Sequence, residues 1–496
     1  MNVLLLSMPD VGPGYSPDIL TAPSLALSSL AGNMDRRHHV KIADLVLRRK
    51  NVKEAVREAL AAVKPDLVGL SAMTFQFDSA VRIAKYIKSV SPGIQVALGG
   101  YHVTLMYCEI AESPDSEYFD LLFRGESELS FNEALNRIEH AQPLSGLDGL
   151  SFKENGRFIH NRRRSLEDLG RIKLPNRSVR LWNDYNTLAV PFDLVEFSRG
   201  CLMSCSFCCI RGMYGRSFRT FGIQRVLEDI HNAKKRGTRI LFFCDDNITT
   251  DVDQFGHLCE EIINHGHNDI HYAVQASSVG IASSKSLVQK MAKAGFKMVF
   301  LGMESASNEN LKYLKKGDII EKTKLAVKYL KESDILVAIG LIIGLPPDDR
   351  KSIERTIAFT RDMEADFASV QLLVPYPKTE IRKQLLKGNL IANLDDFRSY
   401  NSSFATVRTN RLTPGQLSLA AYKYEKKYFK SKKITILRSF RKDIGLAFRF
   451  LGGGLRLLPS FLQFLFHENL KKLFMSERQI FENYLLRESR LNKFNL

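Results

Sequence analysis

Short apolar runs alternate with amphipathic stretches over the first part of the chain. The apolar runs predict β-strands at 2–7, 39–45, 65–73, 94–100 and 119–126. Between them, apolar positions at helical spacing predict helices at 51–64 and 79–90. Strands and helices that alternate at this spacing are typical of a doubly wound parallel sheet in an α/β protein. Ligands of such sheets bind at the carboxyl ends of the strands.

The polar segment 141–190 interrupts this alternation and predicts a linker with two short hairpin-like pieces. The alternation then resumes, with predicted strands at 193–199, 239–246, 271–277, 297–305, 336–344 and 369–377. Six consecutive strand–helix units predict a barrel or partial barrel. In such barrels the active site lies at the carboxyl ends of the strands. The predicted organisation is a doubly wound domain (1–140), a linker (141–190), a barrel domain (191–400) and a basic helical region (401–496).

The length and composition agree with two or three folded domains. The chain has 496 residues, of which 45% are hydrophobic and 25% charged. Seven cysteines in so long a chain do not predict a disulfide scaffold, so a reducing, cytoplasmic location is expected. Most of the net charge of +17 lies after position 407, where the sequence has 19 Lys and Arg but 6 Asp and Glu. Such a basic end suits a nucleic acid, an anionic membrane surface or simply a solvated face.

Four of the cysteines lie together in CLMSCSFCC, directly after the first predicted barrel strand. Cys201, Cys205 and Cys208 form a C-x3-C-x2-C pattern. Three thiolates on one loop can bind three irons of a [4Fe–4S] cluster and leave the fourth iron open to another ligand. A structural zinc site usually has four ligands in two separated pairs, and no second pair is found. Zinc binding and plain core packing remain the alternatives for these cysteines.

The motif, with Phe207 just before its last cysteine, resembles the signature of the radical S-adenosylmethionine (SAM) enzymes. The resemblance implies a partial (βα)6 barrel in which Cys201, Cys205 and Cys208 hold a [4Fe–4S] cluster and the open iron binds SAM. In that family an electron, from a donor such as flavodoxin or ferredoxin, leads to cleavage of SAM. The resulting 5′-deoxyadenosyl radical abstracts hydrogen from a substrate.

Four positions lie in segments that resemble the family's SAM-binding segments, although Cys244-Asp245-Asp246 stands where the family more commonly has Gly-Gly-Glu. Phe207 would help to seat SAM, Asp245 follows the second barrel strand, and Gln275 lies near the end of the third. Glu304 ends the fourth strand, where the resemblance implies contact with the ribose or amino acid part of SAM. Helix N-capping is the alternative for Asp245, Asp246 and Glu304, because a helical pattern follows each.

The first domain resembles the cobalamin-binding subfamily of the radical SAM enzymes. The matching segments are 21–45, 68–77, 98–109 and 123–128. The resemblance implies a corrin across the strand ends, and Gly99 and Gly100 would permit close approach of the backbone. The histidine-ligation motif Asp-x-His-x-x-Gly is absent. His102 is the nearest candidate, but its setting resembles the subfamily's Gly-Gly-x-His turn, which does not supply a cobalt ligand. The alternative is a sheet that recognises substrate or only supports the barrel.

The segment 443–474 is rich in Leu and Phe, but its glycines, Pro459 and two arginines argue against a membrane span. It predicts either an amphipathic helix at the inner membrane surface or a helical cap over the barrel. Peripheral membrane contact would suit a lipid-like substrate.

The predicted function is therefore a SAM- and cobalamin-dependent radical enzyme that methylates an unactivated carbon of a small, lipid-like or other substrate. A cyclase or rearrangement enzyme of the porphyrin-cyclase type is the enzymatic alternative. A tRNA-modifying protein is the alternative from another class. Related tRNA methylthiolases carry a second set of three cysteines and a small RNA-binding β domain. Neither is found here, so nucleic acid is not the expected partner.

Overall fold

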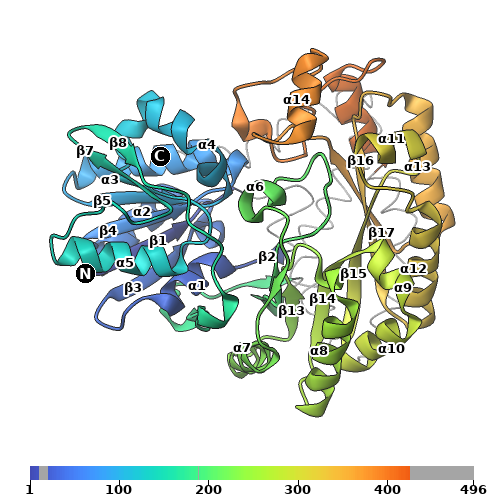
Figure 1. Ribbon diagram of the computed structural model, residues 1–496, viewed down its shortest axis with the longest axis horizontal. Coiled ribbons are helices and arrows are strands. Elements are labelled where there is room, and N and C mark those ends of the chain that lie inside the picture. The colour runs from blue at the N-terminus through green and yellow to red at the C-terminus, as the bar shows by residue number, and fades with distance from the viewer. Residues whose placement is uncertain (11–19, 188, 425–496) are drawn as a thin grey trace, which may run out of the picture.

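Two α/β domains lie side by side in the computed structural model, which describes residues 1–10, 20–187 and 189–424 (Figure 1). The predicted amphipathic segment 443–474 lies outside the described residues. Of the predicted helical region, residues 401–424 are described, and a helix covers 414–424. Among the helices of the described ranges, none combines the length and apolar character that a membrane crossing requires.

The first domain is built on a seven-stranded sheet in the order β3-β1-β4-β5-β6-β7-β8. Its first five strands in that order are parallel, and all five were predicted. β7 and β8 form an antiparallel hairpin from the segment predicted as a linker, and they extend this sheet past β6. The strands are β1 (Asn2–Ser7), β3 (His39–Asp44), β4 (Leu67–Ser71), β5 (Gln95–Gly99), β6 (Leu121–Phe123), β7 (Leu150–Glu154) and β8 (Arg157–His160).

Helices cover both faces of this sheet, as expected for a doubly wound domain. Leu4 and Leu6 of β1 pack with α2, α3 and α4, whereas Val3 and Leu5 pack with α1 and α5 on the opposite face. Burial of each such side chain stabilises the fold by about 1.5–3 kcal/mol. The helices are α1 (Leu25–Asn33), α2 (Val52–Val63), α3 (Phe77–Val90), α4 (Tyr101–Glu112) and α5 (Glu128–Glu139).

The second domain contains the predicted partial barrel. Its sheet has the order β17-β16-β15-β14-β13-β10-β9-β2, and the first six strands in that order run parallel. The six parallel strands are β10 (Val190–Val195), β13 (Ile240–Phe243), β14 (His271–Ser277), β15 (Phe296–Glu304), β16 (Leu336–Ile343) and β17 (Phe367–Leu372). Outer helices include α7 (Ile223–Lys235), α8 (Val252–Asn264), α10 (Lys285–Ala294), α12 (Ile320–Glu332) and α13 (Arg350–Asp362).

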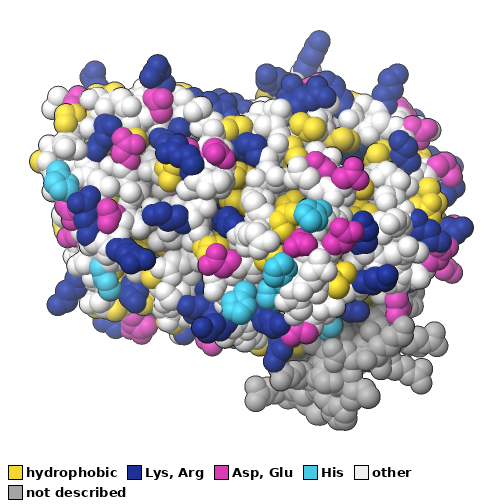
Figure 2. Space-filling model, turned by 60° about the horizontal axis from the view of Figure 1, so that its bottom comes forward, with side chains coloured by type: hydrophobic (Ala, Val, Ile, Leu, Met, Phe, Trp, Pro, Cys, Tyr) yellow, Lys and Arg dark blue, Asp and Glu magenta, His cyan; other side chains and the backbone are white. Residues whose placement is uncertain are grey.

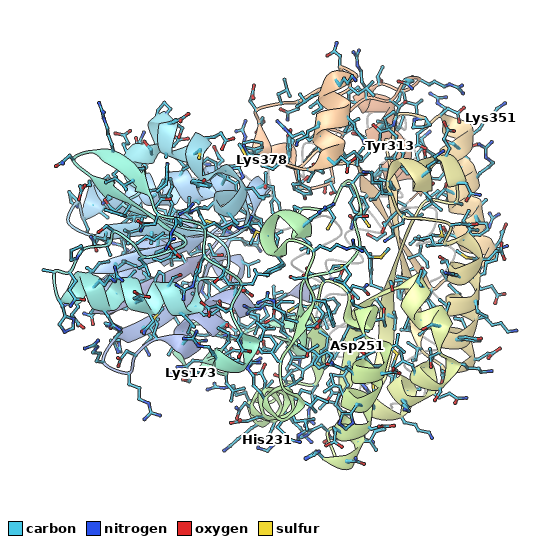
Figure 3. The ribbon with its side chains drawn as sticks, in the orientation of Figure 1. Lys173, His231, Asp251, Tyr313, Lys351 and Lys378 are labelled. Carbon is cyan, nitrogen blue, oxygen red and sulfur yellow. The ribbon has the colours of Figure 1, made fainter. Side chains whose placement is uncertain are left out.

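The two domains share a sheet edge and several polar contacts. β2 (Leu20–Thr21) pairs with β9 (Asn186–Thr187), which pairs with β10, so an N-terminal strand completes the barrel sheet. Tyr185 donates a 3.0 Å hydrogen bond to Asp44 at the end of β3. Lys378 forms an ion pair with Glu109 of α4 across the domain boundary (Figure 3).

Candidate functional site

The cysteine loop lies at the carboxyl ends of the parallel strands. It follows β11 (Ser198–Arg199), which pairs with β12 (Arg219–Thr220), and it leads into α6 (Ile210–Tyr214). Phe207 packs against a buried apolar cluster that includes Ile342 and Leu373, near the ends of β16 and β17. This is the end of the barrel at which the sequence predicts the chemistry.

Ser206, between the second and third cysteines, anchors the loop to two helices of the barrel. Its N–H donates to the carbonyl of Leu314 at 3.0 Å, and its hydroxyl donates to that of Tyr313 at 3.1 Å. Its own carbonyl accepts from the N–H of Ile381 in α14 (Glu380–Lys387) at 2.9 Å. Tyr313 ends α11 (Asn308–Tyr313), so the fourth strand–helix unit supports the loop directly.

The chemistry of the three thiols fits a bound cluster. Cys201, Cys205 and Cys208 are half-buried and form no disulfide. Burial raises the pKa of Cys205 and of Cys208, so without a metal these thiols stay protonated at neutral pH. Iron would displace these protons and neutralise the thiolates. Within the described ranges, no three His, Cys, Asp or Glu side chains are close enough to hold a single metal ion. The fit therefore rests on the donor set.

Asp245 and Asp246 hold the start of the cysteine loop. The Asp245 carboxylate accepts from the Ser198 hydroxyl, and Asp246 accepts from the N–H of Gly200 at 2.9 Å. Burial raises the pKa of Asp245 to about 7 and that of Asp246 to about 6. Asp251 is the N-cap of the following helix, α8, so the capping alternative is wrong for both. Direct contact of Asp245 with SAM stays a prediction.

Glu304 and Lys316 form a buried ion pair beside the cysteine loop, with 2.9 Å between Oε1 and Nζ. Glu304 has a φ of +66°, which turns the chain sharply at the end of β15. Gly302 leaves the pair its space, because a Cβ there would lie 2.7 Å from Glu304 Oε1 and 3.2 Å from Lys316 Nζ. Ser307 caps α11, so the capping alternative for Glu304 is also wrong. A carboxylate beside an ammonium can bind the ammonium and carboxylate groups of an amino acid.

Gln275 lies on the inner face of β14. Its neighbours Val274 and Ala276 belong to the core packed by the helices, so the strand's alternation turns Gln275 the other way, into the barrel. It is half-buried there. The structure thus places Gln275 on the wall of the barrel. The cysteine loop, and Asp245 beside it after β13, lie at the end of the barrel.

Gly99 and Gly100 lie in the first domain, at the end of β5. Gly100 has a φ of +102°, and a Cβ there would lie 2.6 Å from the carbonyl oxygen of Ala72. A Cβ at Gly99 would meet nothing closer than 3.8 Å. The glycines were expected to let a corrin approach the backbone closely. In the structure, the close approach is between Gly100 and the chain at the end of β4. A role in cofactor binding stays a prediction.

The first domain reaches the cysteine loop through α4. Tyr101, its first residue, is near Asp246, and burial raises the pKa of its phenol well above the usual value. Leu105, one turn further, packs on Gly212 of α6, where a Cβ would come within 2.6 Å of Leu105 Cδ2. Tyr101 and Lys316 were not predicted as site residues, although Tyr101 lies in the segment 98–109 that resembles the cobalamin-binding subfamily.

His102 is part of the packing between the domains. Its ring lies between Phe77 and Phe397, with centroid distances of 4.5 and 5.0 Å. Burial lowers its pKa to about 4, so the ring is neutral at physiological pH.

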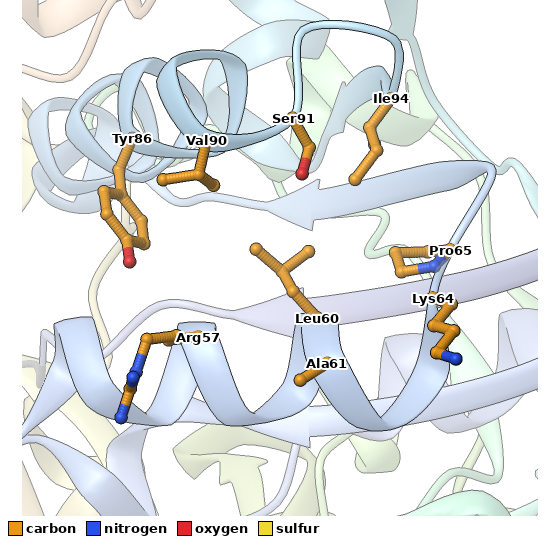
Figure 4. A pocket seen from close by; sticks show the side chains of 9 residues that line it. All are labelled: Arg57, Leu60, Ala61, Lys64, Pro65, Tyr86, Val90, Ser91 and Ile94. Carbon is orange, nitrogen blue, oxygen red and sulfur yellow. The ribbon is translucent and has the colours of Figure 1, made fainter.

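A groove of about 520 Å³ lies between α2 and α3 of the first domain (Figure 4). Leu60, Tyr86 and Ile94 contribute to its lining, and none of the predicted site residues does. It is separate from the candidate site.

Two family models match the chain. The model of the radical SAM superfamily matches residues 195–360, and that of the B12-binding domain matches residues 20–135. The first match contains the cysteine loop, and the second contains the strand ends that face it.

Several curated proteins are similar over most of the chain. An uncharacterized methyltransferase of Pyrococcus horikoshii is 28% identical over 88% of this chain and 94% of its own. An anaerobic magnesium-protoporphyrin IX monomethyl ester cyclase of Rubrivivax gelatinosus is 25% identical over 79% of this chain and 70% of its own. A hopanoid C-3 methylase of Methylococcus capsulatus is 25% identical over 74% of this chain and 69% of its own.

The fold is also that of a solved structure. The radical SAM methyltransferase TsrM of Kitasatospora setae, with cobalamin and a [4Fe–4S] cluster bound, superposes with a TM-score of 0.66. It is 18% identical, and the match covers 78% of each chain. The two matches give the domain order of the chain. It contains a B12-binding domain followed by a domain of the radical SAM superfamily.

Proposed function

We propose that this enzyme transfers a methyl group from SAM to an unactivated carbon of a small molecule and uses both a [4Fe–4S] cluster and cobalamin. One observation carries the proposal. A loop with three cysteines lies at the strand ends of the barrel and leads into α6, which packs on α4, and α4 begins at a strand end of the B12-binding domain. Reaction at the boundary of the two domains would bring both cofactors to one substrate.

Different residues of the chain would bind the different cofactors. Cys201, Cys205 and Cys208 would hold the cluster, and Glu304 with Lys316 would orient the amino acid part of SAM. When bound, the cluster, SAM and the corrin supply radical and methyl-transfer chemistry. The protein positions them and excludes water from the boundary.

Two enzymatic outcomes compete for this site. The hopanoid methylase and the P. horikoshii methyltransferase favour methylation, whereas the protoporphyrin ester cyclase favours ring closure. We favour methylation of a lipid-like substrate at the inner membrane surface, with flavodoxin or ferredoxin as electron donor. On the face in Figure 2, the basic side chains of the described residues are interspersed with acidic ones, so the described part of this face has no broad basic patch of the kind that RNA binding uses.

The test begins with protein purified without oxygen, in which iron, sulfide, cobalt and corrin are measured together. Cys201→Ala, Cys205→Ala and Cys208→Ala should each lose the cluster's electron paramagnetic resonance (EPR) signal. Cys209→Ala is the matched control, because this cysteine is adjacent but outside the motif, and it should keep the signal. A Cys201→Ala protein with a full iron content would overturn the proposal. SAM labelled in its methyl group then distinguishes methylation, which transfers the label to product, from ring closure, which does not.

A further inference from the structure

A cavity of about 170 Å³ lies where the first domain meets the helix after the cysteine loop. Side chains from α4, from the end of β6, from the segment 163–166 and from α6 line it. Its lining includes Thr104, Tyr107, Arg124, Arg163, Arg164 and Met213. Arg163 and Arg164 come from the segment predicted as a linker and lie outside the candidate functional site.

Arg124 is buried in the wall of this cavity, with 6% of its surface exposed. Its guanidinium stacks on Tyr107 at 4.4 Å and donates to the carbonyls of Leu150 and Asn161. Its Nε is buried and has no hydrogen-bond partner. Among the described residues, no carboxylate pairs with Arg124.

Arg163 adds a second guanidinium without a carboxylate in the part of the chain that the structure describes. It donates to the carbonyls of Gly212 and Met213 at 3.0 and 2.9 Å. Its charge and, more strongly, burial lower the pKa of Arg124. Arg164 is paired with Glu167 at 2.6 Å.

Glu126 is the acidic residue of the lining, and its carboxylate is already engaged. Oε1 accepts from Arg199 at 3.2 Å and from Arg219 at 2.8 Å. Oε2 accepts from Arg219 and from the N–H of Glu167. The cavity therefore keeps an excess of positive charge. At the buried Arg124 this charge is costly unless an anion neutralises it.

We propose that this cavity binds one anionic group, a phosphate or a carboxylate, at the boundary of the two domains. Guanidinium groups bind both anions through paired hydrogen bonds. The volume is several times that of a water molecule, about 30 Å³, and suits one such group. The group has two sources: the phosphodiester in the nucleotide tail of cobalamin, or an acidic substituent of the substrate. The site stands on its own charges and does not depend on methyl transfer.

The experiment titrates inorganic phosphate into the anaerobically purified full-length protein by calorimetry, in a chloride buffer. One phosphate should bind per chain, and the double variant R163Q/R164Q should weaken binding about tenfold or more through loss of charge-assisted hydrogen bonds. R162Q is the matched control, because Arg162 is adjacent, 89% exposed and outside the lining, and it should leave binding unchanged. Thermal unfolding checks that each variant is folded. Absence of saturable binding, or equal weakening by R162Q, would overturn the site.

Two corrinoids then identify the source. If hydroxocobalamin abolishes phosphate binding while cobinamide, which lacks the nucleotide tail, does not, the cofactor's phosphodiester occupies the cavity. If phosphate still binds to cobalamin-loaded protein, the cavity serves an acidic group of the substrate. If neither corrinoid binds, the cobalamin part of the proposed function fails, while the phosphate titration still decides the anion site.

Discussion

Arg199 of the barrel domain and Glu128 of the B12-binding domain form a buried ion pair, with 2.7 Å between Nη2 and Oε1. Their side chains are 8% and 7% exposed. Arg199 lies two residues before Cys201, and it also binds Glu126 and Glu196. The pair therefore joins the first domain to the beginning of the cysteine loop.

Loss of this pair should destabilise the protein. Glu128→Gln removes the charge, and we expect the free energy of unfolding to fall by about 2 kcal/mol, the size of a hydrogen bond to a charged group. Glu133→Gln, on the same helix but half exposed, should change it by less than about 0.5 kcal/mol. Denaturant unfolding of the full chain measures both. Equal effects would mean that Arg199 is adequately paired by its other carboxylates.

Stability should depend on pH through Asp245. Its pKa is raised to about 7 in the folded protein, whereas an unfolded aspartate ionises near 3.9. Between these values the folded state binds more protons, so its stability falls as pH rises, by up to roughly 4 kcal/mol above pH 7. Asp245→Asn should flatten this dependence, and Asp253→Asn, which changes an exposed residue, should not. An unchanged profile in Asp245→Asn, measured from pH 4.5 to 8, would contradict the assignment.

Lys316 should contribute to SAM binding. Lys316→Met removes the buried ammonium beside Glu304, and we expect the dissociation constant for SAM to rise about 10- to 100-fold. Lys315→Met is the control, since Lys315 forms only a surface pair with Glu380. Equilibrium dialysis with labelled SAM on cluster-loaded protein measures the change. The same rise in both variants would exclude a specific role for Lys316.

The two neighbouring glycines should respond differently to alanine. Gly100→Ala places a Cβ 2.6 Å from the Ala72 carbonyl at a positive φ, so we expect a loss of about 1–3 kcal/mol in stability. Gly99→Ala has room for its methyl group and should cost less than about 1 kcal/mol. Thermal unfolding compares them. If Gly99→Ala is folded but fails to bind corrin, Gly99 has a direct role in the cofactor site.

Much of the fold could be predicted because hydrophobic periodicity reports local burial. The five parallel strands of the first sheet and the six of the barrel were all predicted from apolar runs, and the cysteine spacing pointed to the cluster loop. Roles of individual polar residues were less accessible. Asp245 and Asp246 had the pattern of helix caps, yet their carboxylates bind the backbone and hydroxyl at the start of that loop.

The sequence by itself determined the element types, the order of the two domains and the three thiols that mark the chemistry, because these depend on short-range pattern and residue type. Only the tertiary structure decided which distant segments meet. It brought β2 to the edge of the barrel sheet, Lys316 to Glu304, and Arg163 to Arg124. Such long-range contacts follow from the packing of whole helices and sheets. The partner of a side chain therefore depends on elements that lie tens of residues away in the sequence.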